Sequence, residues 1–432
     1  MDSVLEGKGL TFSVEIARQG GKNELSAHLE VLLLTLYMAE GGALIKCSPT
    51  FKPQAVISIQ RLKERLDEFG FDGMYRTRMG YIVGLGAARA IFLSAEPSSS
   101  VVGHSADILL EIDESQDVSK EKYSKELRPM GSSSNVTTVH YGTTWDDGTL
   151  LEEIKQGNLE QGRKDGIKRH FRYDWQELGK YNPDYLNFVL EERERLGENH
   201  PLFLTQYALL PIHGGGRFLS LQQIALMQGS HHRLSQPEKG KTYIAGMDLA
   251  GEGADATVIT IAEVTSSLAP PAFYGEGWNE VKIVEHYQWR GISSSQLYPQ
   301  LIDVLKKWGC QRIVVDATGM GQPLSSFLRA QLGRKVIPFT FTQKSKSEMG
   351  FELLAFINSG RLKLYNQDGS SEYQELMFEL ERAKAQYRPN QTVNFFLDPS
   401  EGHDDFLMSL ALMVQAGKDF RPREAKGWLR SS

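Results

Sequence analysis

Short apolar runs and longer amphipathic segments alternate between Phe12 and Tyr141. The short runs are rich in β-branched residues, whereas the longer segments repeat their apolar side chains every three or four residues. The predicted strands are 12–17, 43–47, 90–94, 107–112 and 136–141, and the predicted helices are 23–40, 54–69 and one between the last two strands. Strands separated by helices favour a mostly parallel sheet covered on both faces, with ligands bound at the carboxyl ends of the strands.

A second alternating region follows after residue 241. It is predicted to contain strands at 242–248, 256–264, 281–289 and 312–316, a helix at 295–308 and an apolar helix from 404 to about 416. Glycines at 214–216 and a polar stretch at 230–241 separate the two regions. We therefore expect a first domain over 1–212, a linker over 213–240 with a short helix near 219–228, a second domain over 241–416 and a basic tail over 417–432.

Length, composition and charge agree with this division. A chain of 432 residues exceeds the roughly 100–200 residues of one ordinary domain. Its longest strongly apolar helical stretch, Leu29 to Ala39, is shorter than the roughly 20 residues that cross a bilayer, and no secretion signal opens the sequence. Cys47 and Cys310 lie far apart, which excludes a disulfide framework and favours a reducing cytosol. The net charge of −6 argues against uniform coating of nucleic acid. Basic stretches at 163–172, 334–346 and 418–430 could still contact phosphates locally, or they could be ordinary solvated surfaces.

A phosphate-binding turn is predicted after the first strand. A helix follows the run Arg18, Gln19, Gly20, Gly21, Lys22 and Asn23. The two glycines allow backbone N–H groups to approach a phosphate, the helix N-terminus is positive, and Lys22 adds a charge. The pattern G-x4-G-K-[ST] is incomplete, because Ile16 replaces the first glycine and Asn23 replaces the metal-binding hydroxyl. Taken alone, the run is also explained as a structural turn at a helix start.

An acidic strand end strengthens the nucleotide-binding interpretation. Asp113 and Glu114 directly follow the apolar strand 107–112. In a Walker B arrangement the aspartate holds Mg²⁺ and the glutamate orients the attacking water. A further strand ends in Gly142, Thr143 and Thr144, whose hydroxyls can sense a γ-phosphate. Together these segments predict ATP hydrolysis, whereas an acidic strand end alone would also be explained by solvent exposure.

Aspartates recur at strand and helix ends in the second region. Asp248 and Asp316 each end a predicted strand, and Asp404 and Asp405 open the last predicted helix. Converging carboxylates repel one another, so such a cluster normally holds divalent cations. Two cations roughly 3.5–4 Å apart can activate a water and stabilise the leaving oxygen of a phosphodiester, which predicts a nuclease.

The last pair leaves one alternative open. Successive helix residues point about 100° apart, so one of Asp404 and Asp405 is expected to bind metal directly and the other to support it. The sequence does not distinguish between them. His403 can aid proton transfer or phosphate contact or be an ordinary helix-entry residue, and Asp255 is expected to stabilise a loop.

The order of these motifs resembles the large terminase subunit of tailed bacteriophages, the motor that packages DNA. The resemblance covers almost the whole chain and rests on the variant phosphate turn, the Asp-Glu pair, the Gly-Thr-Thr strand end and the later aspartates. It implies an α/β chain with a RecA-like P-loop ATPase domain of the additional-strand (ASCE) class, followed by an RNase H-like nuclease domain. The run of three strands and then a helix–strand unit in the second region agrees with the latter fold.

The resemblance also implies roles for individual residues. Residues 18–23 bind the nucleotide, with Lys22 on its phosphates, Asp113 binds the metal, and Glu114 is the catalytic carboxylate. Gly142 to Thr144 couple hydrolysis to motion. Lys344 lies where terminases place a basic residue near the nuclease metals, so DNA contact is expected there. An arginine finger acting in trans is implied as well, with Arg78 and Arg89 as equal candidates.

Cofactors, partners and location follow from the same resemblance. ATP and Mg²⁺ are the expected cofactors, with Mn²⁺ as a further cation for the nuclease. The chain would translocate double-stranded DNA into the procapsid and cut concatemers, with the portal protein and a small terminase subunit as partners. Five copies are expected on the portal, and a monomer is compatible with the sequence in solution. The expected location is the host-cell cytoplasm, without a membrane.

Alternative functions share parts of this pattern. The first half could be a degenerate ATPase that acts as a DNA-binding platform, since Asn23 replaces the hydroxyl and only about 15 residues precede the turn. Both halves could be scaffolds with decayed sites, which the intact carboxylates argue against. A transposase or resolvase would share the later aspartates, but it would not need the Asp113–Glu114 pair.

Overall fold

The chain divides into two compact units, each built around its own sheet. The computed structural model describes residues 1–99, 101, 103–212, 215–250, 256–266, 279–319, 321–388 and 390–420. The first unit comprises Met1–Val189, Pro201–Gly214 and Pro389–Gln391, and the second comprises Leu190–His200, Gly215–Arg388 and Thr392–Ser432. Asp255, Gly214 and most of the predicted basic tail (421–432) lie outside the described residues.

The first unit contains an eight-stranded sheet in the order β3-β4-β5-β2-β6-β7-β1-β8. Six strands from β5 to β8 pair in parallel, and β3 and β4 add an antiparallel edge. The strands are β1 (Thr11–Ile16), β2 (Gly42–Ser48), β3 (Tyr75–Arg78), β4 (Ile82–Leu85), β5 (Ala88–Ser94), β6 (Leu109–Ile112), β7 (Thr137–Gly142) and β8 (His170–Tyr173). The helices are α1 (Asp2–Leu5), α2 (Lys22–Leu36), α3 (Val56–Glu68), α4 (Lys120–Lys122), α5 (Leu150–Asp165), α6 (Trp175–Gly179) and α8 (Pro201–Gln206). A further helix, α7 (Pro183–Leu196), begins in this unit, and its residues from Leu190 onward belong to the second unit.

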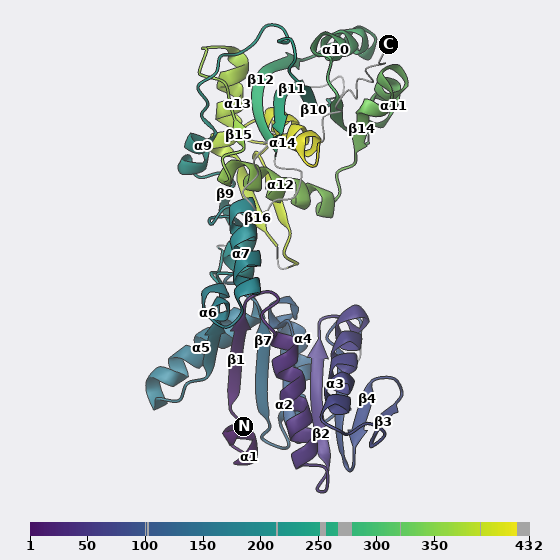
Figure 1. The fold of residues 1–432 in the computed structure, drawn as a ribbon, viewed down its shortest axis with the longest axis vertical. Coiled ribbons are helices and arrows are strands. Elements are labelled where there is room, and N and C mark those ends of the chain that lie inside the picture. The colour runs from purple at the N-terminus through teal and green to yellow at the C-terminus, as the bar shows by residue number, and fades with distance from the viewer. Residues whose placement is uncertain are drawn as a thin grey trace, which may run out of the picture. The chain divides into compact units, whose positions relative to one another are not determined.

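Alternation along the strands supplies a buried layer on each face of this sheet. Leu44 of β2 packs in the cluster that includes α2 and α3, whereas Ile45 and Cys47 pack in the cluster on the opposite face. Figure 1 shows α2 and α3 side by side against the sheet. By the same period of two, the polar residues Lys46 and Glu111 fall on the α2 face, where they are fully buried.

The predicted strands and helices of this unit are present, and the predicted α/β class is confirmed. β3, β4 and β8 were not predicted, because strands of only four residues at or next to the edge of a sheet carry too short a pattern. The predicted helix 23–40 ends at Leu36, where the backbone leaves the helical conformation at Tyr37.

The second unit contains a six-stranded mixed sheet in the order β14-β13-β10-β11-β12-β15 and a three-stranded sheet, β17-β16-β9. In the larger sheet β14, β13 and β10 run in parallel, β11 is antiparallel to both of its neighbours, and β15 is parallel to β12. The strands are β9 (Gly215–Arg217), β10 (Tyr243–Asp248), β11 (Thr257–Ser266), β12 (Asn279–Trp289), β13 (Arg312–Asp316), β14 (Val336–Phe339), β15 (Leu362–Lys363), β16 (Lys384–Tyr387) and β17 (Val393–Phe396). The helices are α9 (Leu221–Met227), α10 (Ser294–Trp308), α11 (Gly321–Leu332), α12 (Gln343–Asn358), α13 (Ser371–Arg382) and α14 (Asp405–Gly417).

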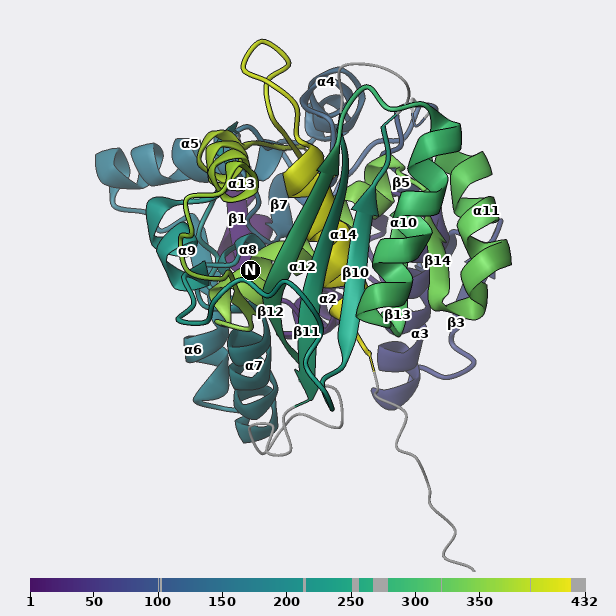
Figure 2. The same cartoon turned by 90° about the horizontal axis from the view of Figure 1, so that it is seen from above.

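The two faces of the larger sheet are covered by different helices. Tyr243, Ala245 and Met247 of β10 pack in the cluster that includes α10 and α11, whereas Ile244 packs in the cluster that includes α14. Figure 2 shows α10 and α14 on opposite sides of β10 and β11. Since side chains alternate along a strand, Asp248 falls on the α14 face, the face of Ile244.

Gly246 allows α14 to lie directly on the central strand. A Cβ atom at this position would overlap the backbone nitrogen of Met413 and the carbonyl oxygen of Ser409. The Ser409 hydroxyl donates to the Gly246 carbonyl oxygen at 3.1 Å, which fixes the contact. The helix start that carries Asp405 is therefore positioned relative to Asp248 by a backbone-to-backbone approach.

Gly246→Ala should destabilise the second unit and displace α14. The added methyl group meets backbone on two sides, so the packing must expand, at a cost of about 1–3 kcal/mol in the free energy of unfolding. Thermal unfolding of the full chain measures this. Gly157→Ala is the matched control, because Gly157 lies in α5 and a Cβ there meets no atom within 4 Å. An unfolding transition unchanged in Gly246→Ala would contradict the packing described here.

The second unit resumes at Gly215 and includes most of the segment that was predicted as a linker. β9 pairs with β16, and α9 starts at a capping box formed by Ser220 and Gln223. Four apolar side chains of this segment lie in the main core of the unit, namely Phe218, Leu219, Ile224 and Met227, whereas Leu221 and Leu226 are exposed. The segment is therefore ordered despite its glycine and serine content, because these apolar side chains anchor it in the core.

Two further properties bear on the sequence analysis. Cys47 and Cys310 are both buried free thiols. In the described part of the chain, no helix combines the length and the apolar character needed to cross a membrane.

Candidate active sites

The predicted phosphate-binding turn joins β1 to α2 in the first unit. Gly21 is the N-terminal cap of α2, with a left-handed φ of 88°, and Gln19 has φ 62°. A side chain at Gly20 would overlap the Leu178 side chain. Glycine is therefore required at 21 by the backbone conformation and at 20 by the packing. The turn directs the free N–H groups of the first turn of α2 outward, as anion binding requires.

Lys22 lies between this turn and the predicted Walker B acids. Its ammonium group is 3.3 Å from Asp113 Oδ1 and also forms an ion pair with Glu114. Burial alone would raise the pKa of Asp113, but the charges of Lys22 and Lys46 hold it below its usual value. Glu114 itself has a left-handed φ of 43°, which is unusual for a residue with a side chain and marks a constrained position.

A buried network joins α2 to the strands beneath it. Lys46 Nζ on β2 donates to Ser26 Oγ at 2.7 Å and to Glu30 Oε1 at 3.1 Å, both on α2. Ser26 Oγ can donate to Glu111 Oε1 on β6, at 3.1 Å. The helix that carries the phosphate-binding turn is thereby fixed to the strand that leads into Asp113.

The predicted coupling segment is linked to Glu114 through Gln116. The Gln116 amide donates to Glu114 Oε2 at 2.8 Å, and its oxygen accepts from the Thr143 backbone N–H at 3.3 Å. A side chain on Gly142 would overlap this oxygen, so glycine is needed there. Thr144 Oγ1 donates to the buried Glu15 at 2.7 Å. Gln116 was missed by the sequence analysis, and its position two residues after Glu114 was the only available signal.

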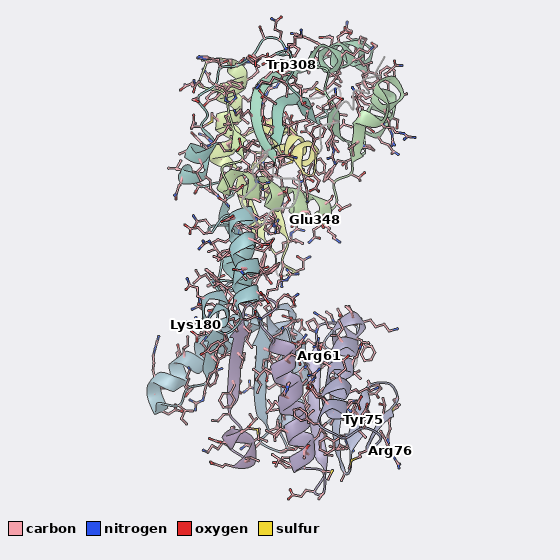
Figure 3. The ribbon with its side chains drawn as sticks, viewed as in Figure 1. Arg61, Tyr75, Arg76, Lys180, Trp308 and Glu348 are labelled. Carbon is pink, nitrogen blue, oxygen red and sulfur yellow. The ribbon has the colours of Figure 1, made fainter. Side chains whose placement is uncertain are left out.

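The turn, Glu114, Gln116 and Thr143 border one cleft of about 560 Å³, a size typical of small-molecule sites, whereas Asp113, Gly142 and Thr144 are not part of its lining. Its lining includes the predicted turn and its surroundings: Arg18, Gln19, Gly20, Gly21, Lys22, Asn23, Arg61, Glu114, Gln116 and Thr143. Arg78 and Arg89 are not among the lining residues. Arg61 of α3, which is labelled in Figure 3, forms an ion pair with Glu24 of α2. Asn23 Oδ1 is buried without a hydrogen-bond partner in the described part of the chain, and an amide oxygen is a suitable ligand for Mg²⁺.

The second-unit aspartates converge on the face of the sheet that α14 covers. Asp248 ends β10, and Asp316 ends the adjacent parallel strand β13. Burial and the carboxylates of Asp405, Asp316 and Asp404 together raise the pKa of Asp248 well above its usual value. Parallel pairing of β10 with β13 brings the strand ends of Asp248 and Asp316 together, and the bond between Asp405 and the Ala256 N–H holds the start of α14 beside the end of β10 and the start of β11. We refer to these four aspartates as the acidic cluster.

Backbone groups orient two members of this cluster. Asp316 Oδ1 accepts from the Thr318 N–H at 2.8 Å, and burial raises its pKa although this bond acts in the opposite direction. Asp405 Oδ2 accepts from the Ala256 N–H at 2.7 Å, at the start of β11. Asp404, the N-terminal cap residue of α14, is more exposed than Asp405.

A fifth acid, Glu379 of α13, lies beside the cluster. It is 2% exposed, and burial raises its pKa to about 9. Its Oε2 accepts from the Leu407 N–H at 2.8 Å. Glu379 could not be predicted from the sequence, because only the packing of α13 on α14 brings it to the site.

Lys346 is a basic residue close enough to Asp404 and Asp248 for their charges to affect its pKa. Burial lowers the pKa of its ammonium group, and the charges of Asp404 and Asp248 act in the opposite direction. The ammonium group also lies 5.4 Å from the ring centroid of Phe395. Lys344, the residue chosen from the sequence, is 85% exposed and lies 3.9 Å from Glu348, which is labelled on α12 in Figure 3. Two residues along a helix correspond to a rotation of roughly 200°, which explains why these lysines face different surroundings.

The acidic cluster suits hard divalent cations, since all of its donors are carboxylate oxygens. Among the described residues, no three acidic, histidine or cysteine side chains already stand at metal-binding distances. Binding would therefore draw together carboxylates that now repel one another. His403 is exposed beside the cluster and makes contacts of its own.

Comparisons with known proteins agree with this geometry. The family model described as "Terminase RNaseH-like domain" matches residues 245–416. The large terminase of the thermophilic bacteriophage D6E has a similar structure, with a TM-score of 0.54, 12% sequence identity, and 95% of this chain and 94% of that chain covered. The same protein in complex with ADP gives a TM-score of 0.53 at 12% identity, covering 96% of this chain and 97% of that chain. Its complex with ATP-gamma-S gives 0.52 at 11% identity, with the same coverage.

No curated protein matches the sequence. The family match covers the β10 to α14 region, which holds all four clustered aspartates, and the structural matches extend over both units. Residues 245–416 therefore resemble terminase RNase H-like domains, and the chain as a whole has the two-domain α/β fold seen in the phage large terminase structures.

Proposed function

We propose that this chain is a phage DNA-packaging motor subunit that hydrolyses ATP to translocate double-stranded DNA into a procapsid and cleaves concatemeric DNA. The convergence of Asp248, Asp316, Asp404 and Asp405 within a terminase RNase H-like domain is the observation that carries this proposal. The cleft at the phosphate-binding turn supports the ATPase part, and the D6E terminase is described in complex with ADP and with ATP-gamma-S.

In the first unit the N–H groups at the start of α2 and the Lys22 ammonium group would bind the phosphates of ATP. Asp113 and Asn23 would hold Mg²⁺, which supplies charge neutralisation on the β- and γ-phosphates when bound. Glu114 would orient the attacking water, and Gln116 would transmit a displacement of Glu114 to the Thr143 backbone. Gly142 to Thr144 would in this way report hydrolysis to the rest of the unit.

In the second unit Asp248, Asp316 and the acids at the start of α14 would hold two divalent cations, Mg²⁺ or Mn²⁺. Bound cations supply an activated water and stabilise the leaving 3′ oxygen. Asp405 is held by the Ala256 N–H, and the N-terminus of α14 favours negative charge at both of its acids. Lys346 would contribute positive charge beside the scissile phosphate.

The partners and location follow from the proposed role. The chain would act with the portal protein and a small terminase subunit, as five copies on the portal, in the host-cell cytoplasm at the procapsid. DNA would be held chiefly through its phosphates.

Cleavage and ATP turnover by the intact chain test the proposed function. Supercoiled plasmid should be nicked and linearised with Mg²⁺ or Mn²⁺, and EDTA should stop the reaction. DNA should stimulate ATP hydrolysis, and cognate procapsids with ATP should protect packaged DNA from added nuclease. Silence with both metals and no ATP turnover would refute the proposal, whereas cleavage without turnover would favour a nuclease on a degenerate ATPase platform.

Lys346→Met should slow DNA cleavage roughly 10²-fold, the usual effect of removing one preorganised group that stabilises charge in a transition state. The methionine retains the length of the side chain and its packing on Phe395. Lys344→Met is the matched control on the same helix, and its rate should remain within about threefold of the parent, because an exposed ion pair contributes little. Initial nicking rates at saturating Mn²⁺ measure both. If the two variants lost the same amount of nicking rate, these lysines would act in general DNA binding and not at the cleavage site.

A further inference from the structure

Helix α14 is not capped by its own N-terminal cap residue. An aspartate at this position normally folds its carboxylate back onto the free N–H groups of the first turn. The side chain of Asp404 makes no such hydrogen bond. The first turn of α14 is buried, since Asp405, Phe406 and Leu407 are all buried, and unpaired N–H groups would be costly there.

Glu379 supplies the missing cap from another helix. Its Oε2 accepts from the Leu407 N–H at 2.8 Å. This is one of the two N–H groups to which a capping Asp404 would bind. Glu379 is 2% exposed, so no water replaces it readily.

We propose that Glu379 is a positioning residue, which caps α14 from α13 and thereby leaves the Asp404 carboxylate available to the metal site. The proposal rests on the proposed nuclease function. Asp405 does not depend on this cap in the same way, because the Ala256 N–H holds its carboxylate. Glu379 itself touches no reacting atom in this scheme.

Removal of Glu379 should divert Asp404. In Glu379→Ala the Leu407 N–H loses its partner, and the carboxylate of the N-cap residue Asp404 is placed to accept from it. The helix remains capped, but the metal site loses one of its acids. Glu379→Gln retains an acceptor oxygen of the same reach, so it should retain the position of Asp404.

Direct Mn²⁺ binding to the full-length chain without DNA tests the proposal, measured by titration calorimetry or by the loss of the free Mn²⁺ signal in electron paramagnetic resonance. Glu379→Ala should bind Mn²⁺ roughly 10–100-fold more weakly than the parent, the usual range for a residue that orients metal ligands. Glu379→Gln should remain within about threefold. Glu381→Ala, an exposed glutamate on the same helix, is the matched control and should bind as the parent does. Thermal unfolding in EDTA shows which variants fold. If Glu379→Ala does not fold, Glu379→Asp replaces it, because the shorter side chain does not reach the N–H groups of α14.

A double-mutant cycle with Asp404→Asn isolates the mechanism. If Glu379 acts through Asp404, Glu379→Ala should weaken Mn²⁺ binding little further once Asp404→Asn is present. Unchanged Mn²⁺ affinity in a folded Glu379→Ala chain would overturn the inference and leave the proposed function intact. So would additive losses in the double mutant, or equal losses in Glu379→Ala and Glu379→Gln. A parent chain that neither binds Mn²⁺ nor cleaves DNA would overturn both.

Discussion

Asp316→Asn should reduce metal-dependent DNA cleavage by at least roughly 10³-fold. Charge stabilisation by a bound cation is worth several kcal/mol in such a reaction, and each 1.4 kcal/mol or so corresponds to a factor of ten in rate. The amide retains the size of the side chain and can still accept the Thr318 N–H bond through its oxygen. It removes the negative charge that a divalent cation requires. Initial nicking rates of supercoiled plasmid with Mg²⁺ and with Mn²⁺ measure the effect.

The same variant should be at least as stable as the parent in EDTA. Burial raises the pKa of Asp316 and of Asp248, so each ionised carboxylate is less favourable in the folded chain than in the unfolded chain. The sign follows from linkage: a carboxyl group with a raised folded-state pKa binds its proton more tightly when folded, so stability increases as the pH falls through that range. Neutral Asn removes the penalty at pH 7. If Asp316→Asn does not cleave DNA but unfolds at the same or a higher temperature than the parent, the loss of cleavage is therefore catalytic and does not result from unfolding.

Asp303→Asn is the matched control for this experiment. It makes the same chemical change at an exposed position of α10, a helix that packs in the core cluster on the opposite side of β10 from α14. Cleavage should be unchanged. If Asp316→Asn cut as fast as the parent, the acidic cluster would not be the catalytic centre.

The strand-end aspartates could be predicted because their information is local. Asp248 and Asp316 each end a β-branched run, and the period of two determines which face of the sheet they share. Parallel pairing of β10 with β13 then brings the two strand ends together. The start of α14 could also be predicted, since an apolar helical pattern begins directly after Asp405.

Glu379 and Lys346 could not be predicted in the same way. Glu379 is an ordinary acid in the amphipathic pattern of α13, and only the packing of α13 on α14 gives it a buried partner. The choice between Lys344 and Lys346 depends on the rotation of α12, which is fixed by the contact of Gly350 with Phe395 and by other tertiary packing. Long-range contacts of this kind leave no mark in a single sequence.

The extent of the second unit illustrates a similar difficulty. The segment after Gly215 contains few apolar residues and several turn-forming residues, and the sequence predicted a linker over 213–240. In the structure Phe218 and Met227 pack against strands and helices far along the chain, and β9 pairs with β16. Pairing over such a distance cannot be inferred from a local pattern.

Lys22→Ala and Glu114→Gln should each reduce ATP hydrolysis roughly 10²–10³-fold, but for different reasons. Lys22 would bind the phosphates in both the ground state and the transition state, so its loss should weaken nucleotide binding as well as turnover. Glu114 would act only on the attacking water, so Glu114→Gln should bind ATP about as well as the parent and hydrolyse it slowly. Steady-state hydrolysis together with the affinity for a fluorescent ATP analogue separates the two effects. Lys125→Ala, at an exposed lysine of the same unit, is the control.

Stability and DNA cleavage distinguish this prediction from simple loss of the fold. Lys22→Ala removes the cation that faces Asp113 and Glu114, so the chain should unfold at a lower temperature without nucleotide, whereas Glu114→Gln removes one of two adjacent acids and should not. Both variants should still nick plasmid with Mn²⁺, because the acidic cluster belongs to a separate unit.

If the parent chain hydrolyses no ATP and neither substitution changes its nucleotide affinity, the first unit is a platform that has lost its ATPase activity. If turnover disappears in both variants and Glu114→Gln still binds ATP, the incomplete phosphate-binding motif is functional, and Asn23 is sufficient in place of the usual hydroxyl.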